Sequence, residues 1–237
     1  MVARGLCLFS PRPVTLGNPG FLALGIEPDS RLLIPAVQIK SVEFIGAIGQ
    51  IGQKAPAAAA GLPRVAFSGR SNVGKSSLIN RLLGRTRSPV ARVSSTPGKT
   101  LEINFFRVRS DRGEFVLVDL PGYGFAKAPA ELRARWGRLM DDYLRSDEQL
   151  KGVVQLVDIR HGPTADDLRA IDYLAGLNVP VLFVLTKADK LRPQRRMAAV
   201  REITDRLGVD ESQVVAFSAL SGEGVEELRA SVGALID

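Results

Sequence analysis

The sequence is poor in the residues that build zinc sites and disulfide frameworks. It holds one cysteine, Cys7, and one histidine, His161, among 237 residues. A lone cysteine excludes an intramolecular disulfide, and too few nitrogen and sulfur ligands remain for a zinc site. Because a single cysteine is typical of proteins from a reducing compartment, we expect a cytoplasmic protein.

Long apolar runs are missing as well. The longest ones, such as residues 181–185, fall far short of the roughly 20 residues that a membrane-spanning helix needs. We therefore expect no membrane partner. Apolar residues still make up 45% of the chain and charged residues 24%, which is typical of a globular protein.

Residues 1–37 lack any helix or strand period, because prolines and glycines interrupt them. We interpret them as a flexible N-terminal extension, and we expect residues 38–237 to form one domain.

Acidic residues are scarce in one stretch of the chain. Residues 61–110 contain ten Lys or Arg and one Asp or Glu, although the whole chain has a net charge of only +7. A positive field of this kind favours a polyanionic partner such as RNA. A solvated basic face without a partner is the alternative, and charge alone does not decide between them.

From residue 64 onward, apolar strand-like runs alternate with helical patterns, which predicts an α/β fold of three layers. We expect a mainly parallel six-stranded sheet with helices on both faces. One antiparallel hairpin is expected where residues 101–109 and 114–119 are joined by a short turn. Residues 38–44 also alternate and are a candidate edge strand. The other strands are expected at 64–68, 152–158, 179–186 and 213–218, and the helices at 75–84, 129–148, 165–176, 193–207 and 224–236.

A glycine-rich segment lies between the first of these strands and the first helix, which is the context that a phosphate-binding loop requires. Its glycines let the backbone turn tightly, so that N–H groups and the helix N-terminus face an anion. Lys75 can reach the β- and γ-phosphates, and the Ser76 hydroxyl can bind Mg²⁺. The predicted nucleotide-binding residues here are Gly69, Arg70, Ser71, Asn72, Val73, Gly74, Lys75 and Ser76.

A second motif, Asp119, Leu120, Pro121 and Gly122, ends the strand at 114–119. The carboxylate of Asp119 can hold Mg²⁺ through a water molecule, and the Gly122 N–H can bind the γ-phosphate. Tyr123 follows at the position where Ras-type GTPases carry the glutamine that orients the attacking water. Tyrosine cannot replace that glutamine, so we expect the protein alone to hydrolyse the bound nucleotide slowly. A partner or a cation is expected to stimulate this hydrolysis.

Two further motifs end later strands and suit a guanine base. They are Thr186, Lys187, Ala188 and Asp189, and Phe217, Ser218 and Ala219. The carboxylate of Asp189 can accept two hydrogen bonds that guanine offers and adenine does not. Lys187 can lie along the base, and backbone N–H groups at Ser218 and Ala219 can bind the guanine oxygen.

The polar segment 94–100 lies between the first two motifs and is predicted to be a loop. A threonine in such a loop can complete the Mg²⁺ shell when a γ-phosphate is present. Thr96 and Thr100 both qualify, and spacing does not choose between them.

The motifs GRSNVGKSSLIN, STPGKT followed by INFF, DLPGYG, LVDIRHGP and TKADK resemble the EngB (YihA/YsxC) family of Era-like bacterial GTPases. The resemblance covers about residues 38–237. It implies a single G domain that binds GTP and GDP with Mg²⁺, hydrolyses GTP, acts with ribosomal particles or rRNA in large-subunit assembly, and is needed for cell division and septation. We also expect the protein to be a monomer.

The resemblance also assigns roles to residues. It implies Ser76 and Thr100 as Mg²⁺ ligands, and it adds Gly98, Lys99, Thr100 and Leu101 to the nucleotide-binding residues. The chain departs from the family at Leu101, where glutamine is usual, and at Ala219, where serine is usual. We assign catalytic roles to Lys75, Asn72 and Gly122.

Asn72 has two interpretations. Some Era-like GTPases bind K⁺ through an asparagine of the phosphate loop, where the ion offsets charge that develops on the phosphates. Alternatively, Asn72 only stabilises its own turn. Two other functions compete with a ribosomal GTPase: a non-ribosomal P-loop NTPase, and an RNA-binding module with a structural nucleotide.

Overall fold

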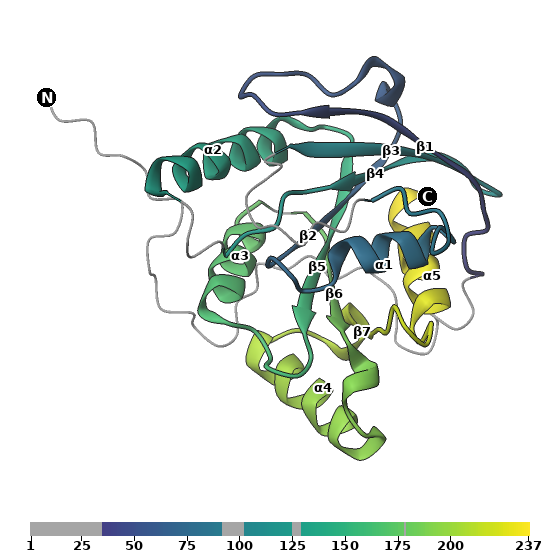
Figure 1. Ribbon diagram of the computed structural model, residues 1–237, viewed down its shortest axis with the longest axis vertical. Coiled ribbons are helices and arrows are strands. Elements are labelled where there is room, and N and C mark those ends of the chain that lie inside the picture. The colour runs from purple at the N-terminus through teal and green to yellow at the C-terminus, as the bar shows by residue number, and fades with distance from the viewer. Residues whose placement is uncertain (1–34, 92–101, 125–128, 178) are drawn as a thin grey trace, which may run out of the picture.

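Seven strands of the described chain form one sheet (Figure 1). The computed structural model describes residues 35–91, 102–124, 129–177 and 179–237. The strands are β1 (Ile39–Ile48), β2 (Arg64–Gly69), β3 (Ile103–Ser110), β4 (Gly113–Asp119), β5 (Leu150–Asp158), β6 (Val181–Thr186) and β7 (Val214–Ala216). Their order across the sheet is β1-β3-β4-β2-β5-β6-β7. The strands from β4 to β7 are parallel, whereas β3 is antiparallel to both β1 and β4.

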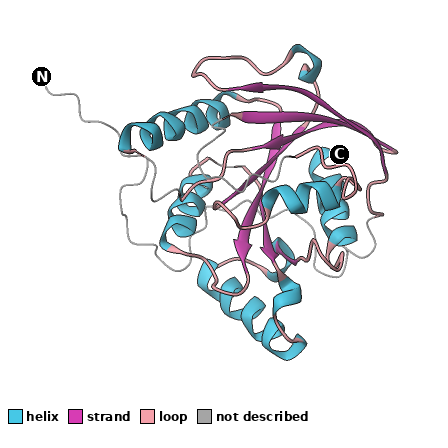
Figure 2. Cartoon of the chain, in the orientation of Figure 1, coloured by secondary structure: helices cyan, strands magenta, loops and turns pink. Residues whose placement is uncertain are grey.

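Helices cover both faces of this sheet. Figure 1 shows α1 and α5 on one side and α2 and α3 on the other, and Figure 2 shows how helices follow strands along the chain. The helices are α1 (Lys75–Leu82), α2 (Ala130–Ser146), α3 (Ala165–Ala175), α4 (Pro193–Leu207) and α5 (Val225–Ile236). Short 3₁₀ turns are formed by Ala57–Ala59, Ala188–Lys190 and Glu211–Gln213.

The sheet separates two apolar cores, because side chains alternate between the faces of each strand. Val65 and Phe67 of β2 pack with Leu78 of α1 in one core. Ala66 lies between them in sequence and packs in the other core, which α2, α3 and α4 complete. In that second core the ring of Tyr143 meets Phe105 edge-on at 5.7 Å.

The predicted α/β class and three-layer arrangement are confirmed, but the predicted number of six strands is too low. The candidate edge strand at 38–44 is the seventh, and as β1 it runs on to Ile48. Register shifts between Ile39 and Ser41 and between Phe44 and Gly46 interrupt its pairing with β3. These bulges break the strict alternation that marks a strand in sequence, and Gly46 takes a φ of +138° there.

The parallel strands carry their carboxyl ends to one edge of the sheet, where ligands bind in such folds. The phosphate loop, Asp119 and Thr186 all lie at these ends. Within the described residues, no helix is both long enough and apolar enough to cross a bilayer.

Candidate functional site

The phosphate loop joins β2 to α1, and its glycines are required for two different reasons. A Cβ on Gly69 would lie 2.9 Å from Val73 Cγ1 and 3.0 Å from Leu156 Cβ, so only glycine fits there. Gly74 takes a φ of +106° and caps α1. Asn72 also adopts the left-handed conformation, with a φ of +63°. Asparagine tolerates this conformation better than most residues.

The N-terminus of α1 offers unpaired donors. Among the described residues, the N–H groups of Gly74, Lys75 and Ser76 have no hydrogen-bond partner, and the first bond of this turn runs from Leu78 N to Gly74 O. A helix start with free N–H groups is a suitable site for an anion. The structure therefore supports the predicted contact of this loop with phosphate groups.

Lys75 and Asp119 form an ion pair between Nζ and Oδ1. Lys75 begins α1 and Asp119 ends β4, so the pair joins the first two predicted motifs. Both side chains are nearly buried, with 12% and 11% of their surface exposed. The pair places the lysine that is predicted to bind phosphate beside the carboxylate that is predicted to bind metal, at the carboxyl end of β4.

The donor set near this pair fits Mg²⁺. Ser76 provides a hydroxyl and Asp119 a carboxylate, and magnesium prefers oxygen ligands and retains several of its waters. The described residues contain no group of three or more His, Cys, Asp or Glu side chains that could hold a metal alone. A magnesium ion here would therefore bind together with nucleotide oxygens.

The segment after Asp119 lies directly against the phosphate loop. Tyr123 donates its N–H to Gly69 O at 3.3 Å and accepts a hydrogen bond from Ser71 N at 2.8 Å. A Cβ on Gly122 would lie 3.3 Å from both Ser71 N and Ser71 Cα. Gly122 is thus placed beside the residues that are predicted to hold phosphate.

The third motif is built around Asp189, in the 3₁₀ turn after β6. Ser218 donates its hydroxyl to Asp189 Oδ1 at 2.7 Å, and Lys190 pairs with Oδ2 at 3.2 Å. The hydrogen bond from Ser218 and the nearby Lys190 lower the pKa of Asp189. Asp189 therefore remains an ionised acceptor at neutral pH, as recognition of a guanine base requires.

The fourth motif contributes fewer donors than its sequence suggested. The N–H of Phe217 is bonded to Leu185 O at 2.9 Å, and that of Ser218 to Glu223 O at 3.0 Å. The N–H of Ala219 has no partner among the described residues. Of the predicted backbone donors, Ala219 is the one that remains available, and Ser218 acts through its hydroxyl on Asp189.

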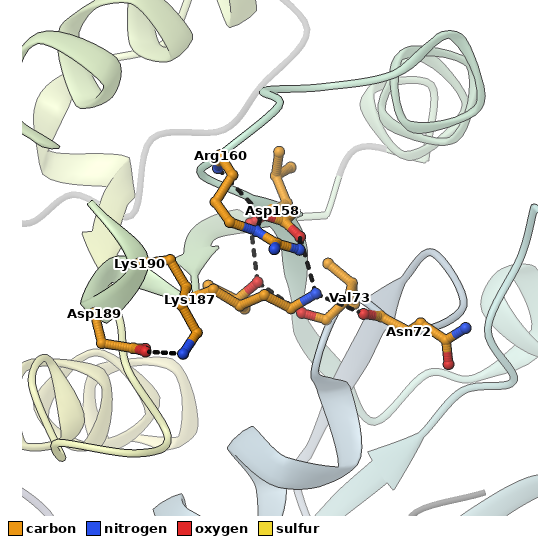
Figure 3. Close-up of polar contacts among 9 residues, drawn as sticks. Asn72, Val73, Asp158, Arg160, Lys187, Asp189 and Lys190 are labelled. Atoms are coloured by element: carbon orange, nitrogen blue, oxygen red, sulfur yellow. Dashed lines mark hydrogen bonds and ion pairs between the residues drawn. The ribbon is translucent and has the colours of Figure 1, made fainter. Parts of the chain in front are cut away.

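Two residues of the predicted base-binding loop, residues 186–189, contact the phosphate loop, and Figure 3 shows one of them, Lys187, beside Asn72 and Val73. Thr186 donates its hydroxyl to Val73 O at 2.7 Å. Lys187, with a φ of +64°, donates from Nζ to Asn72 O at 2.8 Å and to Asp158 Oδ2 at 2.9 Å. Ala188 in turn donates its N–H to Phe217 O at 3.1 Å, so the two base motifs are also joined.

Asp158 and Arg160 belong to this cluster, although sequence reasoning gave them no site role. Figure 3 shows Asp158 between Arg160 and Lys187. Arg160 donates to both carboxylate oxygens, at 2.9 and 2.7 Å. Burial alone would raise the pKa of Asp158, but the hydrogen bonds from Arg160 and Lys187 outweigh it and hold that pKa well below its usual range. The available signal was its position at the carboxyl end of β5.

The predicted residues Gly98, Lys99, Thr100 and Leu101 lie outside the described residues, as does the alternative Thr96. The described motifs from β2, β4, β6 and β7 all meet at one edge of the sheet.

Comparison with known proteins gives this site a family. A family model described as "50S ribosome-binding GTPase" matches residues 64–187, and one described as "Elongation factor Tu GTP binding domain" matches residues 138–237. A "Probable GTP-binding protein EngB" from Gemmatimonas aurantiaca is 47% identical over 84% of this chain and 94% of its own length. The protein of the same name from Syntrophomonas wolfei is 44% identical over 84% of this chain and 99% of its own length.

Solved structures of GTP-binding proteins have a similar fold. A crystal structure of a probable GTP-binding protein engB has a TM-score of 0.58 and 25% identity, covering 73% of this chain and 98% of that one. A structure of Era in complex with MgGDPNP and nucleotides 1506–1542 of 16S ribosomal RNA has a TM-score of 0.61 and 26% identity, covering 74% of this chain and 57% of that one. The chain therefore belongs to the EngB family of GTP-binding proteins and is a GTPase.

Proposed function

We propose that this GTPase is a nucleotide-dependent switch that binds the large ribosomal subunit during its assembly. The observation that carries the proposal is the match of residues 64–187 to a family described as 50S ribosome-binding GTPases. The structure of Era, a protein of similar fold, contains a segment of 16S ribosomal RNA, which supports RNA as a partner here.

The proposed G domain comprises residues 38–237, preceded by an extension at 1–37. In it, Lys75 neutralises charge on the phosphates, and Gly122 donates its N–H to the γ-phosphate. Ser76 and Thr100 are the proposed Mg²⁺ ligands, with Asp119 acting through water. The ion would offset phosphate charge when bound.

The proposed switch works through order and release of two segments. GTP orders residues 94–100 and 119–128 by contacts to the metal and the γ-phosphate, and hydrolysis releases them. Slow intrinsic turnover is stimulated by the ribosome, or by K⁺ held at Asn72. A ribosomal particle that binds the ordered segments then binds the GTP form of the protein more tightly than the GDP form.

The basic stretch contains two kinds of arginine, and only one kind is available to a polyanion. Arg107 and Arg109 are paired with Glu43 and Glu114. Arg85 forms no ion pair within the described residues, and neither does Arg87, whose side chain is exposed. We propose that Arg85 and Arg87 contact rRNA, because unpaired arginines can bind phosphates without first breaking an internal pair.

The outer face of α2 is a weaker candidate for the same contact. Arg145 is engaged by Asp141 at 2.6 Å and lies over the ring of Tyr173. Arg135 reaches Gly49 O at 3.4 Å. Of the three arginines on this face, Arg138 alone has no partner among the described residues.

The test is capture of large ribosomal subunits and their precursors by protein loaded with GDP or with a non-hydrolysable GTP analogue. We expect capture only with the analogue, together with faster GTP turnover when particles are added. Equal capture in both states would contradict a switch. Turnover without capture would favour a non-ribosomal NTPase, and capture without turnover would favour an RNA-binding module with a structural nucleotide.

A matched pair of double variants tests the contact surface. Arg85→Gln with Arg87→Gln removes two unpaired charges, and Arg107→Gln with Arg109→Gln removes two paired ones. We expect the first pair to reduce the salt dependence of particle binding, since each lost phosphate contact lowers the slope by about one. The second pair should leave that slope nearly unchanged.

We extend the proposal to cell division and septation, which the family resemblance implies. Depletion of the protein should produce undivided, elongated cells together with precursors of the large subunit. Normal division in depleted cells that accumulate such precursors would separate the two roles.

A further inference from the structure

Tyr123 is attached to two different parts of the molecule. Its backbone N–H and carbonyl are bonded to Gly69 and Ser71, and a parallel bridge pairs it with Arg70. Its side chain points elsewhere and is buried, with 6% of the residue exposed. The residue therefore connects the phosphate loop with the buried groups that bind its hydroxyl.

The phenol hydroxyl lies between two buried polar groups. It donates to Asp167 Oδ1 at 2.7 Å and accepts from Gln155 Nε2 at 2.7 Å. Burial raises the pKa of Tyr123, and the charge of Asp167 raises it further. The hydroxyl thus keeps its proton at neutral pH and remains a donor to Asp167.

Asp167 cannot easily follow the ring if the ring moves, because it also caps α3. Its Oδ2 accepts hydrogen bonds from Thr164 N at 2.8 Å and from Thr164 Oγ1 at 2.6 Å. This capping box fixes the carboxylate at the start of the helix. Gln155 is equally fixed, since it is fully buried in the central strand β5.

Packing encloses the ring less completely than its burial suggests. Tyr123 lines an apolar cavity of about 40 Å³ together with Trp136, Met140 and Tyr173. On this side the nearest aromatic neighbour is the ring of Trp136, whose centroid lies 6.5 Å from that of Tyr123. The two hydrogen bonds of the hydroxyl therefore act together with the packing against Trp136 to hold the ring in place.

From this geometry we propose that Tyr123 is a positioning residue: its hydroxyl, held by Asp167 and Gln155, keeps Gly122 against the phosphate loop in the γ-phosphate-binding arrangement. The inference rests on the proposed contact of Gly122 with the γ-phosphate. It predicts a defect for the triphosphate alone, because GDP has no γ-phosphate for Gly122 to bind.

The main test compares Tyr123→Phe with Tyr173→Phe. Tyr173 also donates its hydroxyl to an aspartate, Asp141, at 2.7 Å, and it lines the same cavity, so it is a matched control. We expect Tyr123→Phe to weaken binding of a non-hydrolysable GTP analogue at least about fivefold, because the substitution removes both buried hydrogen bonds of the hydroxyl, with GDP affinity unchanged. Tyr173→Phe should lower the melting temperature without altering the ratio of the two affinities.

A second variant guards against a trivial loss of folding. Gln155→Met removes the other partner of the hydroxyl without touching the helix cap, and it should show the same selective defect. Combined with Tyr123→Phe it should add little, because both changes break one network. Equal losses for GDP and the analogue, or no loss in either single variant, would overturn the proposal.

Gly122→Ala separates this inference from the proposed site itself. The added Cβ would lie 3.3 Å from Ser71 and should push the segment away from the loop. If Gly122→Ala does not discriminate the analogue from GDP, the proposed role of Gly122 is wrong. If it does discriminate and Tyr123→Phe does not, Gly122 keeps its role and the positioning role of Tyr123 is wrong.

Discussion

Replacing Asp158 by asparagine is expected to weaken GDP and GTP binding equally, by about three- to tenfold. Asp158 Oδ2 accepts a hydrogen bond from Lys187 Nζ at 2.9 Å, and among the described residues the carbonyl of Asn72 is the one other partner of that ammonium. An amide of the same shape still accepts a hydrogen bond but carries no charge, and charge-assisted bonds are roughly twice as strong as neutral ones. The loss is therefore about half of the roughly 1.5–3 kcal/mol that a bond to a charged group contributes, and about 1.4 kcal/mol is a factor of ten in affinity.

The two nucleotides should be affected alike because Lys187 is expected to lie along the base, which GDP and GTP share. Calorimetric titration of both nucleotides measures the effect. Arg160→Gln is the matched control. It removes the other side-chain partner of Asp158, but the Arg160 side chain is 37% exposed and forms no hydrogen bond to the phosphate loop within the described residues. Such pairs contribute about 0.2–1 kcal/mol, so we expect less than a fivefold change. An unchanged GDP affinity in Asp158→Asn, or a loss confined to GTP, would refute the reasoning.

The same carboxylate should contribute to the pH dependence of stability. Its pKa in the folded protein is held below the unfolded value of about 4, so its stabilising effect is fully present above pH 4 and is lost as the pH falls further. We expect Asp158→Asn to show a shallower loss of melting temperature between about pH 4 and pH 2 than the wild type, while the two curves run parallel from pH 5 to pH 8. Parallel curves over the whole range would mean that the ion pairs of Asp158 do not stabilise the fold.

Three other predictions concern the nucleotide and its ions. Asp189→Asn should weaken GTP binding and admit xanthosine triphosphate, because an amide can donate to the oxygen at position 2; unchanged GTP affinity would refute the guanine assignment. Ser76→Ala should weaken Mg²⁺-dependent binding of both nucleotides, whereas Thr100→Ala should affect GTP alone; equal losses for GDP would show that the Thr100 loop does not sense the γ-phosphate. GTP turnover should be faster in KCl than in NaCl at equal ionic strength, and Asn72→Ala should abolish the difference; equal rates in the wild type would leave stimulation to the ribosome.

The sequence predicted the alternation of elements and the position of each motif because both are local properties. Apolar period identifies a strand, and the residues that end it follow within a few positions. The need for glycine in the phosphate loop was also predictable. In the structure Gly69 has no room for a side chain, and Gly74 has a positive φ. For the same reason the bulged strand β1 was underestimated, since Gly46 shifts its register and the alternation stops before the strand does.

Contacts between strand ends could not be predicted in this way. Asp158 meets Lys187 only because β5 and β6 are parallel neighbours in register, with Asp158 opposite Thr186. Nothing in the local sequence distinguishes that carboxylate from any other at the end of a strand. The direction of Tyr123 is a similar case, because its partners Gln155 and Asp167 come from β5 and α3.

The phosphate loop explains how these separate contacts become one site. For its N–H groups to face an anion, its carbonyls must turn away, and buried carbonyls need donors. Thr186 supplies a donor to the carbonyl of the buried Val73, and Lys187 donates to the carbonyl of Asn72, which is exposed.

The segment after β4 supplies the donor for Gly69, through the N–H of Tyr123. The predicted base-binding loop and the segment after β4 thus contact different peptide groups of the phosphate loop. Loss of the ion pair at Asp158 would disturb the part of the site that is predicted to hold the guanine base, so we expect GDP and GTP to lose affinity together. Loosening the segment after β4 at Tyr123 disturbs only the part that Gly122 faces, so the triphosphate alone should be affected. We therefore expect recognition of the base and sensing of the γ-phosphate to be separable by mutation, because Thr186 and Lys187 contact Val73 and Asn72, whereas Tyr123 contacts Gly69 at the start of the loop.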